Sequence, residues 1–444
     1  MSTSAVSVHP VLNIVRESGP IDGADITRRS TSVREWARKV GVEASESVRT
    51  DGYLAKSVAS GPIDVVDLFC GCGGLSAGFE YVGRKVKSYR LAGAVDVDPW
   101  ACSTYARNLP IRPMLADLSE ETRTEAKLKR LVGSFQLHRS APLVLIGGPP
   151  CQGFSAHRKK NFAGNDHRNT LVSAFARVVN FLKPDFVLFE NVPEVLSERH
   201  WHYFRQMQVA LRGKGYRVRA QIHNLAGFGV PQERFRAIIM GARRTFDMPL
   251  PYVEPEKFRT VRDAIGLLKP VEPGERGSDP MHFCTQHKES TIRTIRQVPK
   301  DGGRRPAGVG PRCLDRVDGF RDVYGRMYWD RPANTITAYA RNPASGRYIH
   351  PSQHRGLTIR EAALLQGFPS DWVFDGPFDH KFLQIGNAVP PIFAAYVAAH
   401  VLGELLSTSA GRVVKEELED ILSPTSNSFS SGIAGRKKGV WRLS

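Results

Sequence analysis

The chain of 444 residues carries 62 Lys and Arg against 44 Asp and Glu, which gives a formal net charge of +18 and a pI of about 9.8. This length suits one large domain with an insertion, or two domains, and the charge favours a polyanionic partner, either nucleic acid or an anionic membrane surface. The sequence has no apolar run of about 20 residues that would predict a membrane span, no secretory signal pattern, and too few cysteines for a disulfide framework.

The first 60 residues form a polar, basic N-terminal extension. Ser32 and Glu35 have capping-box spacing, so a short helix is expected from Val33 to Val40. The extension 1–60 is interpreted as a mobile segment with one helix. A small regulatory or DNA-binding element is the alternative interpretation.

A regular alternation of apolar runs and longer helix-compatible stretches begins at Ile63. The runs that predict buried strands are 63–69, 91–95, 143–146, 186–189 and 237–241. This alternation predicts an α/β fold, in which a parallel sheet carries helices on both faces. We assign residues 61–245 to this main domain.

The sequence changes character after the last predicted strand. Residues 246–355 are rich in Pro, Gly, Arg and Lys and show little periodicity, which predicts a smaller, irregular domain. Residues 356–406 regain helical periodicity and are expected to return to the main domain. The polar tail, 407–444, is expected to be loose.

Two helix signals mark the returning segment. Thr358 and Glu361 have capping-box spacing, and Gly367 suits the end of the helix that they begin. A last apolar helix is expected from about Pro391 to Leu406. No internal repeat is found.

Cys151 is the residue whose setting is most informative. The strand before it ends in Gly147-Gly148-Pro149-Pro150, where the glycines allow a sharp turn and the prolines fix the backbone. A thiol mounted so rigidly at the edge of a sheet is expected to meet a ligand, because a structural cysteine needs no such mounting. Cysteine and histidine pairs with zinc-like spacing are not found, so no metal site is expected.

The first two strands end in ligand-binding patterns. A glycine-rich turn from Phe69 to Gly74 follows the first strand and permits close approach of a ligand to the backbone. Asp96 ends the second strand, where an acid can bind ribose hydroxyls, although it could equally be a solvated loop acid. Together the two patterns predict an adenosine-type ligand.

Charged residues also lie at later strand ends. Glu190 ends the fourth strand and is a candidate general acid, with a helix N-cap or a surface ion pair as the alternatives. Because the carboxyl ends of parallel strands meet at one sheet edge, Cys151 and Glu190 are expected near each other. Arg234 and Arg236 alternate before the fifth strand and suit phosphate or carbonyl recognition, or an exposed basic strand start.

In this order the motifs resemble those of the DNA (cytosine-5)-methyltransferase family, bacterial restriction-modification type. The resemblance runs from about Ile63 to about Leu405 and is carried by Asp67–Gly74, Gly148–Ser155, Glu190–Val192, Gln232–Arg236, Leu357–Pro369 and Gln384–Pro391. It implies a Rossmann-like sheet that binds S-adenosylmethionine. It also implies that 61–245 is the catalytic and cofactor-binding domain and 246–355 the target-recognition domain.

The resemblance implies methyl transfer from S-adenosylmethionine to C5 of a cytosine that is flipped out of duplex DNA. Cys151 would add to C6, and Glu190 would protonate or hydrogen-bond N3 so that negative charge does not build up on the ring. The family assigns Arg236 to holding the cytosine and Arg234 to a nearby phosphate.

The implied cofactor residues are distributed over the strand ends and the last motif. Phe69 would pack on the adenosine portion, Asp96 would bind the ribose, and Asp117 would meet the adenine amino group. Val97 stands where some relatives carry an aromatic residue that stacks on adenine. The complete set is Phe69, Gly71, Gly73, Gly74, Asp96, Val97, Asp117, Leu118, Pro149, Asn387 and Val389.

Duplex DNA is the implied partner, and a cognate restriction endonuclease is expected unless the enzyme is a solitary methylase. In relatives the segment after the nucleophile closes over the DNA. The residues expected to contact DNA here are Gln152, Ser155, Arg158, Lys159 and Arg168. We expect a cytoplasmic, nucleoid-associated monomer that does not bind a membrane.

Three other interpretations remain open. A tRNA cytosine-5 methyltransferase would share the chemistry, but its characteristic Cys-Phe-Thr motif is matched only by Phe283-Cys284-Thr285, in another order. A DNA-binding regulator with vestigial catalysis would use the charge and the leader helix. A generic Rossmann oxidoreductase would explain the sheet without explaining the Pro-Cys and Glu-Asn-Val motifs.

Overall fold

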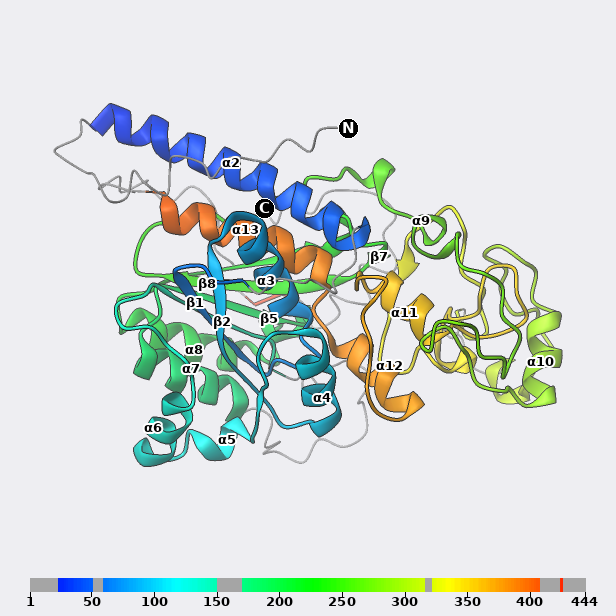
Figure 1. Ribbon diagram of the computed structural model, residues 1–444. Helices are drawn as coiled ribbons and strands as arrows, with labels where there is room; N and C mark the ends of the chain where they lie inside the picture. The colour runs from blue at the N-terminus through cyan, green and yellow to red at the C-terminus, as the bar shows by residue number, and fades with distance from the viewer. Residues whose placement is uncertain (1–22, 51–58, 150–169, 316–321, 408–423, 426–444) are drawn as a thin grey trace.

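The computed structural model describes residues 23–50, 59–149, 170–315, 322–407 and 424–425. Its centre is a seven-stranded sheet in the order β3-β2-β1-β4-β5-β8-β6 (Figure 1). These strands are β1 (Ile63–Leu68), β2 (Tyr89–Asp96), β3 (Met114–Leu115), β4 (Leu143–Gly147), β5 (Phe186–Asn191), β6 (Arg217–Asn224) and β8 (Phe235–Ala242). A separate parallel pair joins β7 (Gln232–Glu233) to β9 (Ala333–Asn334).

All five predicted strands are confirmed, and β3 and β6 are additional. The pairs β1–β2, β1–β4, β2–β3 and β4–β5 are parallel, whereas β8 runs antiparallel to both β5 and β6. The expectation of a wholly parallel sheet is therefore wrong at β8. The reason is the short link from β6 to β8, because a parallel connection needs a crossover of about a dozen residues or more.

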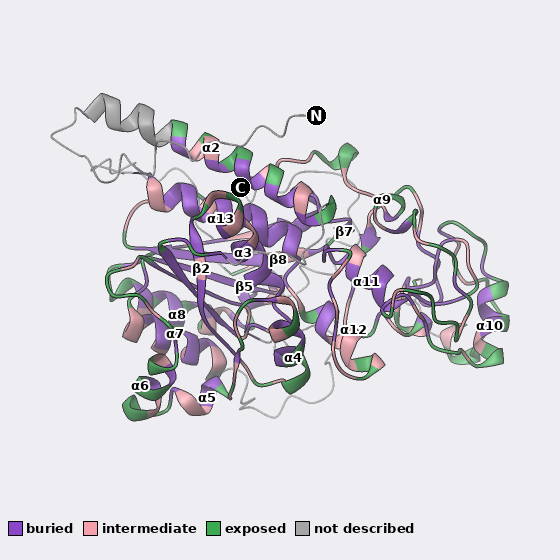
Figure 2. Cartoon of the chain, in the orientation of Figure 1, coloured by how far each residue is buried: buried purple, intermediate pink, exposed green. Residues whose placement is uncertain are grey.

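Helices cover both faces of the sheet, as the sequence predicted (Figure 1). One face carries α2 (Gly23–Thr50), α3 (Gly74–Val86), α4 (Pro99–Asn108) and α13 (Pro391–Leu406). The other carries α5 (Leu118–Glu121), α6 (Glu125–Gly133), α7 (Thr170–Leu182) and α8 (Trp201–Arg212). Between the helices, the central strands β1, β4 and β5 are buried along their lengths (Figure 2).

The smaller lobe contains α9 (Val261–Ile265) and α10 (Glu289–Arg296), joined by long irregular segments (Figure 1). The returning segment forms α11 (Ile359–Leu365) and α12 (Phe378–Asn387), which lie between this lobe and the main domain. The predicted capping box is present at the start of α11, where Thr358 and Glu361 each bond the other's backbone N–H. Gly367 follows that helix with a φ of 84°, as its predicted role as a helix stop requires.

Residues just after β8 stay close to the sheet. Phe246 packs edge-on against Phe186 of β5 at a centroid distance of 5.3 Å. Tyr252 stacks on Tyr396 of α13 at 5.0 Å. These contacts favour a boundary of the smaller domain nearer to α9 than to residue 246.

The N-terminal helix differs from the expected short helix over Val33 to Val40. Helix α2 has 28 residues, and from Val33 onward one of its faces is buried against α13. The helix continues through Gly41, although glycine is a poor helix former. In the structure a Cβ at Gly41 would lie 3.1 Å from the Tyr396 ring, so the glycine makes room for α13. From Val33 onward the N-terminal extension packs against the main domain, whereas a mobile segment was expected.

Two further points concern the C-terminal region. The predicted last helix is confirmed as α13, and the apolar stretch 378–406 has the length and composition of a membrane span, but 83% of its most apolar window is buried inside the protein. Within the tail that was expected to be loose, Thr425 forms a β-bridge with Ser197, which follows β5.

The contact between α3 and α13 leads to a first prediction. A Cβ on Gly78 would lie 2.2 Å from the backbone carbon of Ala394. We expect Gly78→Ala to lower the free energy of unfolding by about 1–3 kcal/mol, the usual cost of overpacking. Urea unfolding followed by circular dichroism measures the change.

Gly133, the last residue of α6, provides the control, since it is also a helical glycine but a Cβ there meets nothing within 4 Å. We expect Gly133→Ala to change the free energy of unfolding by no more than about 0.5 kcal/mol. Equal losses in the two variants would contradict the close approach of α3 and α13.

Candidate functional site

A pocket of about 470 Å³ opens at the carboxyl ends of β1, β2, β4 and β5. This is where ligands bind in open α/β sheets, and the volume falls within the range of small-molecule sites, about 300–1,000 Å³. Its lining includes all but one of the described residues that the sequence analysis proposed: Phe69, Gly71, Gly74, Asp96, Val97, Asp117, Leu118, Pro149, Glu190, Arg234, Arg236, Asn387 and Val389.

The glycine turn between β1 and α3 has the backbone conformation that its sequence requires. Phe69, Gly71 and Gly73 have φ values of 62°, 53° and 92°, and residues other than glycine rarely adopt positive φ. A Cβ on Gly71 would meet nothing within 4 Å, so the turn leaves open space beside the pocket. Such a cradle suits a ligand that approaches the backbone closely.

Gly73 is the proposed residue that does not line the pocket. It caps α3, and a Cβ there would lie 2.4 Å from Leu109 Cδ1. The structure therefore gives Gly73 a packing role in place of the expected cofactor contact.

Gly74 joins the turn to the far end of the chain. A Cβ on Gly74 would lie 2.2 Å from the carbonyl oxygen of Val389, which also lines the pocket. Asn387 ends α12 two residues earlier. The last motif thus closes the pocket against the first, as the resemblance implied.

Two acids stand at the side of the pocket expected to hold ribose and adenine. Asp96 ends β2 and accepts the N–H of Gly71 at 2.7 Å and that of Asp98 at 2.9 Å. Burial raises the pKa of Asp96 above its ordinary value. Asp117 caps α5 by accepting the N–H of Ser119 at 2.8 Å. Val97, between the acids in the pocket wall, is 64% exposed.

Asp67 is a pocket residue to which the sequence analysis gave no role. It lies at the end of β1, accepts the Ser76 hydroxyl at 2.6 Å through Oδ2, and has no hydrogen-bond partner for Oδ1 among the described residues. Burial is the main reason that the pKa of this carboxyl rises to about 7. The sequence feature that could have identified Asp67 is its place in the Asp67–Gly74 motif, which contains the glycine turn.

Glu190 and Arg236 form an ion pair across the other side of the pocket. Arg236 Nε lies 2.9 Å from Glu190 Oε1, and both side chains are largely buried. The N–H does not point at that oxygen with hydrogen-bond geometry, so the contact is chiefly electrostatic. The expected alternatives for Glu190, an N-cap or a surface ion pair, do not describe this buried position.

The end of β4 approaches Glu190 directly. A Cβ on Gly148 would lie 3.4 Å from Glu190 Oε2, and the neighbouring Asn191 donates its side-chain N–H to the Pro149 carbonyl at 3.2 Å. The Gly-Pro run and the Glu-Asn-Val motif therefore meet at one point of the pocket.

Arg234 lies inside the protein and is only 2% exposed. Its guanidinium donates to the carbonyls of Ile336, Gly386 and Ala388 at 3.1, 3.1 and 3.2 Å. Arg234 and Arg236 both line the pocket, as the alternation along the strand predicted. The bonds to carbonyls give Arg234 a framework role, and its contact with a phosphate remains a prediction.

Cys151 and the residues proposed to contact DNA lie outside the described residues. These are Gln152, Ser155, Arg158, Lys159 and Arg168. Their proposed roles remain predictions.

Comparison with known proteins agrees with this geometry. The chain matches the family described as C-5 cytosine-specific DNA methylase over residues 63–403. It is 34% identical to the type II methyltransferase M1.HphI of Haemophilus parahaemolyticus, with 76% of this chain and 86% of that protein covered. It is also 34% identical to the type II methylase M.HgiDII of Herpetosiphon aurantiacus, with 76% and 94% covered.

A similar fold is found in solved structures. A prophage-encoded protein of E. coli, described as a DNA modification methyltransferase, superposes with a TM-score of 0.59 at 24% identity, covering 77% of this chain and 99% of that one. The Dnmt2 methyltransferase of S. pombe gives a TM-score of 0.51 at 16% identity, covering 76% and 96%. At these identities the likeness concerns the fold.

The position of Asp96 leads to a second prediction. We expect Asp96→Ala to raise the dissociation constant for S-adenosylmethionine at least about tenfold, because a charged hydrogen-bond acceptor contributes about 1.5–3 kcal/mol. Isothermal titration calorimetry measures this dissociation constant.

Asp185→Ala is the control. Asp185 also accepts a backbone N–H, that of Leu143, but it lies outside the pocket lining. Unchanged affinity in Asp96→Ala would refute the assignment.

Asp67 leads to a third prediction, on pH. Its pKa is about 7 in the folded protein against an ordinary 3.8, so between these values the unfolded chain has lost a proton that the folded protein retains. The free energy of unfolding therefore falls as pH rises from about 4 to about 7. Above about pH 7 this loss of stability no longer grows. Asp67→Asn removes this dependence.

We expect Asp67→Asn to gain free energy of unfolding over the parent as pH rises from 5 to 7, by at most about 3 kcal/mol, since each pH unit contributes at most about 1.4 kcal/mol. Urea unfolding at several pH values measures the difference. A difference between the two proteins that does not vary with pH would contradict the buried, protonated state of Asp67.

Proposed function

The chain belongs to the C-5 cytosine-specific DNA methylase family and is a DNA cytosine-5-methyltransferase with S-adenosylmethionine as methyl donor. On this premise we propose that it methylates cytosines at one short duplex sequence. The target cytosine would be flipped out of the duplex and would form a covalent bond between its C6 and Cys151. The observation that carries the proposal is the meeting of Glu190, Arg236 and the Gly148–Pro149 run in the same pocket as the glycine turn.

The residues present fit the donor. The open space at Gly71 admits a group close to the backbone, Asp96 and Asp117 offer carboxylate acceptors, and Phe69, Val97 and Leu118 offer apolar surface for a purine ring. Pro149, Asn387 and Val389 complete the wall from the opposite side. When bound, S-adenosylmethionine supplies an electrophilic methyl group to C5.

Cys151 and Glu190 share the activation of cytosine, whose C5 is too weak a nucleophile by itself. The Cys151 thiolate forms a bond to C6 while Glu190 donates a proton or a hydrogen bond to N3, so that C5 gains electron density. After methylation a base removes the C5 proton, the C6–S bond breaks, and the electron pair returns to Cys151 as thiolate. Arg236 lies beside Glu190 and would hold the cytosine.

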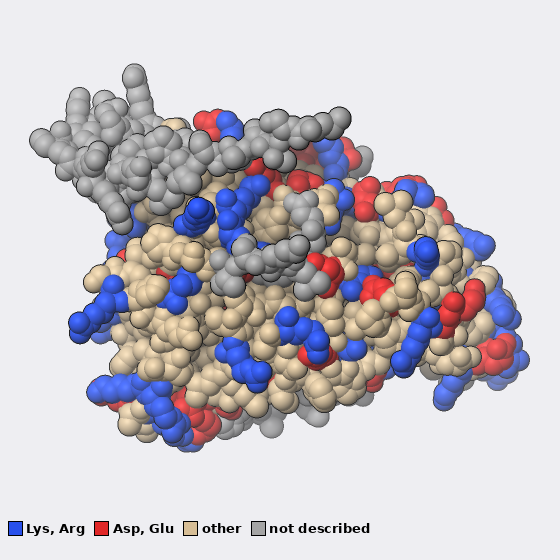
Figure 3. Space-filling model, viewed as in Figure 1, with Lys and Arg blue, Asp and Glu red and all other residues tan. Residues whose placement is uncertain are grey.

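The basic composition supports a polyanionic substrate. Lys and Arg are distributed over both lobes of the face seen in Figure 3, and the net charge of +18 favours binding to the DNA backbone. The target base must leave the duplex to reach a pocket at the strand ends, so base flipping is part of the proposal. The segment with Gln152, Ser155, Arg158, Lys159 and Arg168 would contact the DNA.

The biological setting follows from the relatives. Because M1.HphI and M.HgiDII are named type II enzymes, we propose that the chain is the modification enzyme of a restriction-modification system with a cognate endonuclease, or a solitary methylase. It would act as a cytoplasmic, nucleoid-associated monomer, with residues 246–355 as the target-recognition domain.

Bisulfite sequencing tests the proposal first. Plasmid DNA from a methylation-free host that expresses the chain should carry modified cytosines at one short recurring sequence. Absence of modified cytosine in DNA, with methyl transfer to tRNA, would replace this proposal with the tRNA enzyme.

Two variants test the mechanism. We expect Cys151→Ala to abolish methyl transfer and to leave S-adenosylmethionine binding within about twofold, and Glu190→Gln to slow transfer by about 10²–10⁴-fold, as loss of a general acid does. Glu198→Gln, which alters an exposed carboxylate after the same motif, should be neutral. Turnover retained by Cys151→Ala would rule out the covalent adduct.

A further inference from the structure

Helix α2 lies outside the matched family segment, 63–403, and yet forms part of the main core. Its buried apolar residues recur with helical spacing on one face and are Val33, Ala37, Val40, Ala44 and Val48. This face packs along α13, and the helix also contacts α3 (Figure 1). The arrangement makes α2 an integral layer of the main domain.

Small residues fix α2 against α13. A Cβ on Gly403 of α13 would lie 2.6 Å from the Ala37 Cβ, and a Cβ on Gly41 of α2 would lie 3.1 Å from the Tyr396 ring. The two helix backbones therefore approach each other closely at two successive points of the contact. Closely packed helices of this kind have little freedom to slide or rotate.

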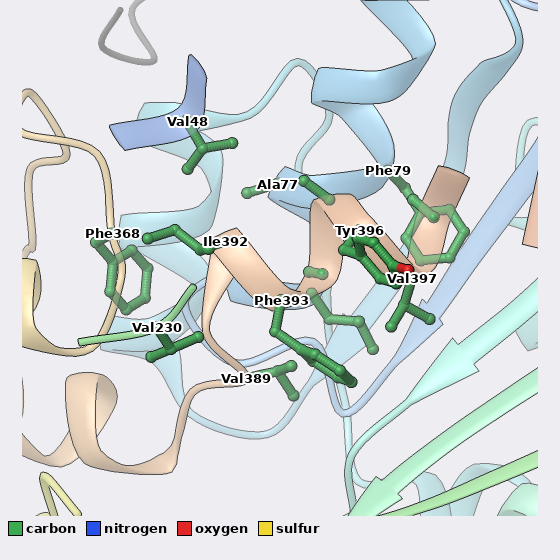
Figure 4. Close-up of a cluster of buried hydrophobic side chains, with 14 of the residues drawn as sticks. Val48, Ala77, Phe79, Val230, Phe368, Val389, Ile392, Phe393, Tyr396 and Val397 are labelled. Atoms are coloured by element: carbon green, nitrogen blue, oxygen red, sulfur yellow. The ribbon is translucent and has the colours of Figure 1, made fainter. Parts of the chain in front are cut away.

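Ser45 ties α2 to the first turn of α13. The Ser45 side chain is buried, with 1% of the residue exposed, and its hydroxyl donates to the Ile392 carbonyl at 2.9 Å. Figure 4 shows Val48 of α2 over the same turn, with Ile392 next to it and Val389 on the segment that leads into α13. Because Val389 also lines the cofactor pocket, α2 is fixed relative to that pocket.

The C-terminal end of α2 also reaches the entrance to the smaller lobe. Glu46 forms an ion pair with Arg259, which directly precedes Thr260, the N-cap of α9. The N–H of Val261 in α9 donates in turn to the Arg331 carbonyl at 2.9 Å. Glu46 thus contacts the chain at the point where it enters the smaller lobe.

We propose that α2 is a positioning element for target recognition: Glu46 holds Arg259, and with it the start of α9, in a fixed place relative to the cofactor-binding segment before α13. The effect on DNA rests on the proposed function, because it requires the smaller lobe to read the target sequence. The mechanical part of the proposal, the holding of α9, is independent of activity.

Glu46→Gln in the full chain tests the proposal by two measurements. Hydrogen exchange should become faster for the backbone amides of residues 259–265, because the contact that holds them is weakened. Steady-state methylation of a plasmid duplex should show a KM for DNA raised about three- to fivefold, the scale of a partly exposed ion pair, with the KM for S-adenosylmethionine unchanged within about twofold. The charge-swapped pair, Glu46→Arg with Arg259→Glu, should restore both quantities toward the parent values.

Glu43→Gln is the matched control. It removes an ion pair of α2 one turn earlier, with Lys85 of α3 at 3.4 Å, which lies wholly within the main domain. This variant should leave exchange at 259–265 and the KM for DNA unchanged. Equal exchange in the Glu46→Gln and Glu43→Gln variants, or no recovery in the charge-swapped pair, would overturn the proposal. A parent protein that methylates no DNA would contradict the proposed function instead, and the exchange result would still decide the role of α2.

Discussion

The close approach of the first and last motifs is the constraint on which the site depends. The start of α3 and the segment before α13 touch where a Cβ on Gly74 would lie 2.2 Å from the Val389 carbonyl oxygen. Behind this contact α3 and α13 pack together, and Gly78 allows the same close distance. The shape of the pocket is therefore set by core packing, because a shift of α13 would move the pocket wall with it.

The pocket has two sides of different charge. Asp67 and Asp96 lie on the cofactor side, and burial raises the pKa of both. A cation bound near them would favour their ionised forms, and S-adenosylmethionine carries positive charge on its sulfonium and amino groups. On the opposite side Glu190 is paired with Arg236. The arrangement separates the two acids on one side of the pocket from Glu190 on the other.

Buried arginines hold the two lobes together. Arg234 donates to carbonyls of Ile336, Gly386 and Ala388, which come from the segment after β9 and from the last motif. In the smaller lobe Arg355 forms a buried, bidentate pair with Glu361 of α11 at 2.7 Å to each oxygen. Backbone carbonyls and a buried carboxylate satisfy these guanidiniums, as burial of charge demands. The bonds of Arg234 hold the segment after β9 next to the last motif, which lines the pocket.

The sequence by itself determined the local features of this protein. Apolar runs predicted the main strands, the Thr358–Glu361 box and Gly367 predicted α11 and its end, and the motifs identified most of the described pocket lining. These signals depend on residues near one another in the chain. Only the tertiary structure decided the inward position of Arg234, the direction of β8 and the docking of α2. Those outcomes depend on which distant segment each residue meets, and side-chain type alone does not specify that partner.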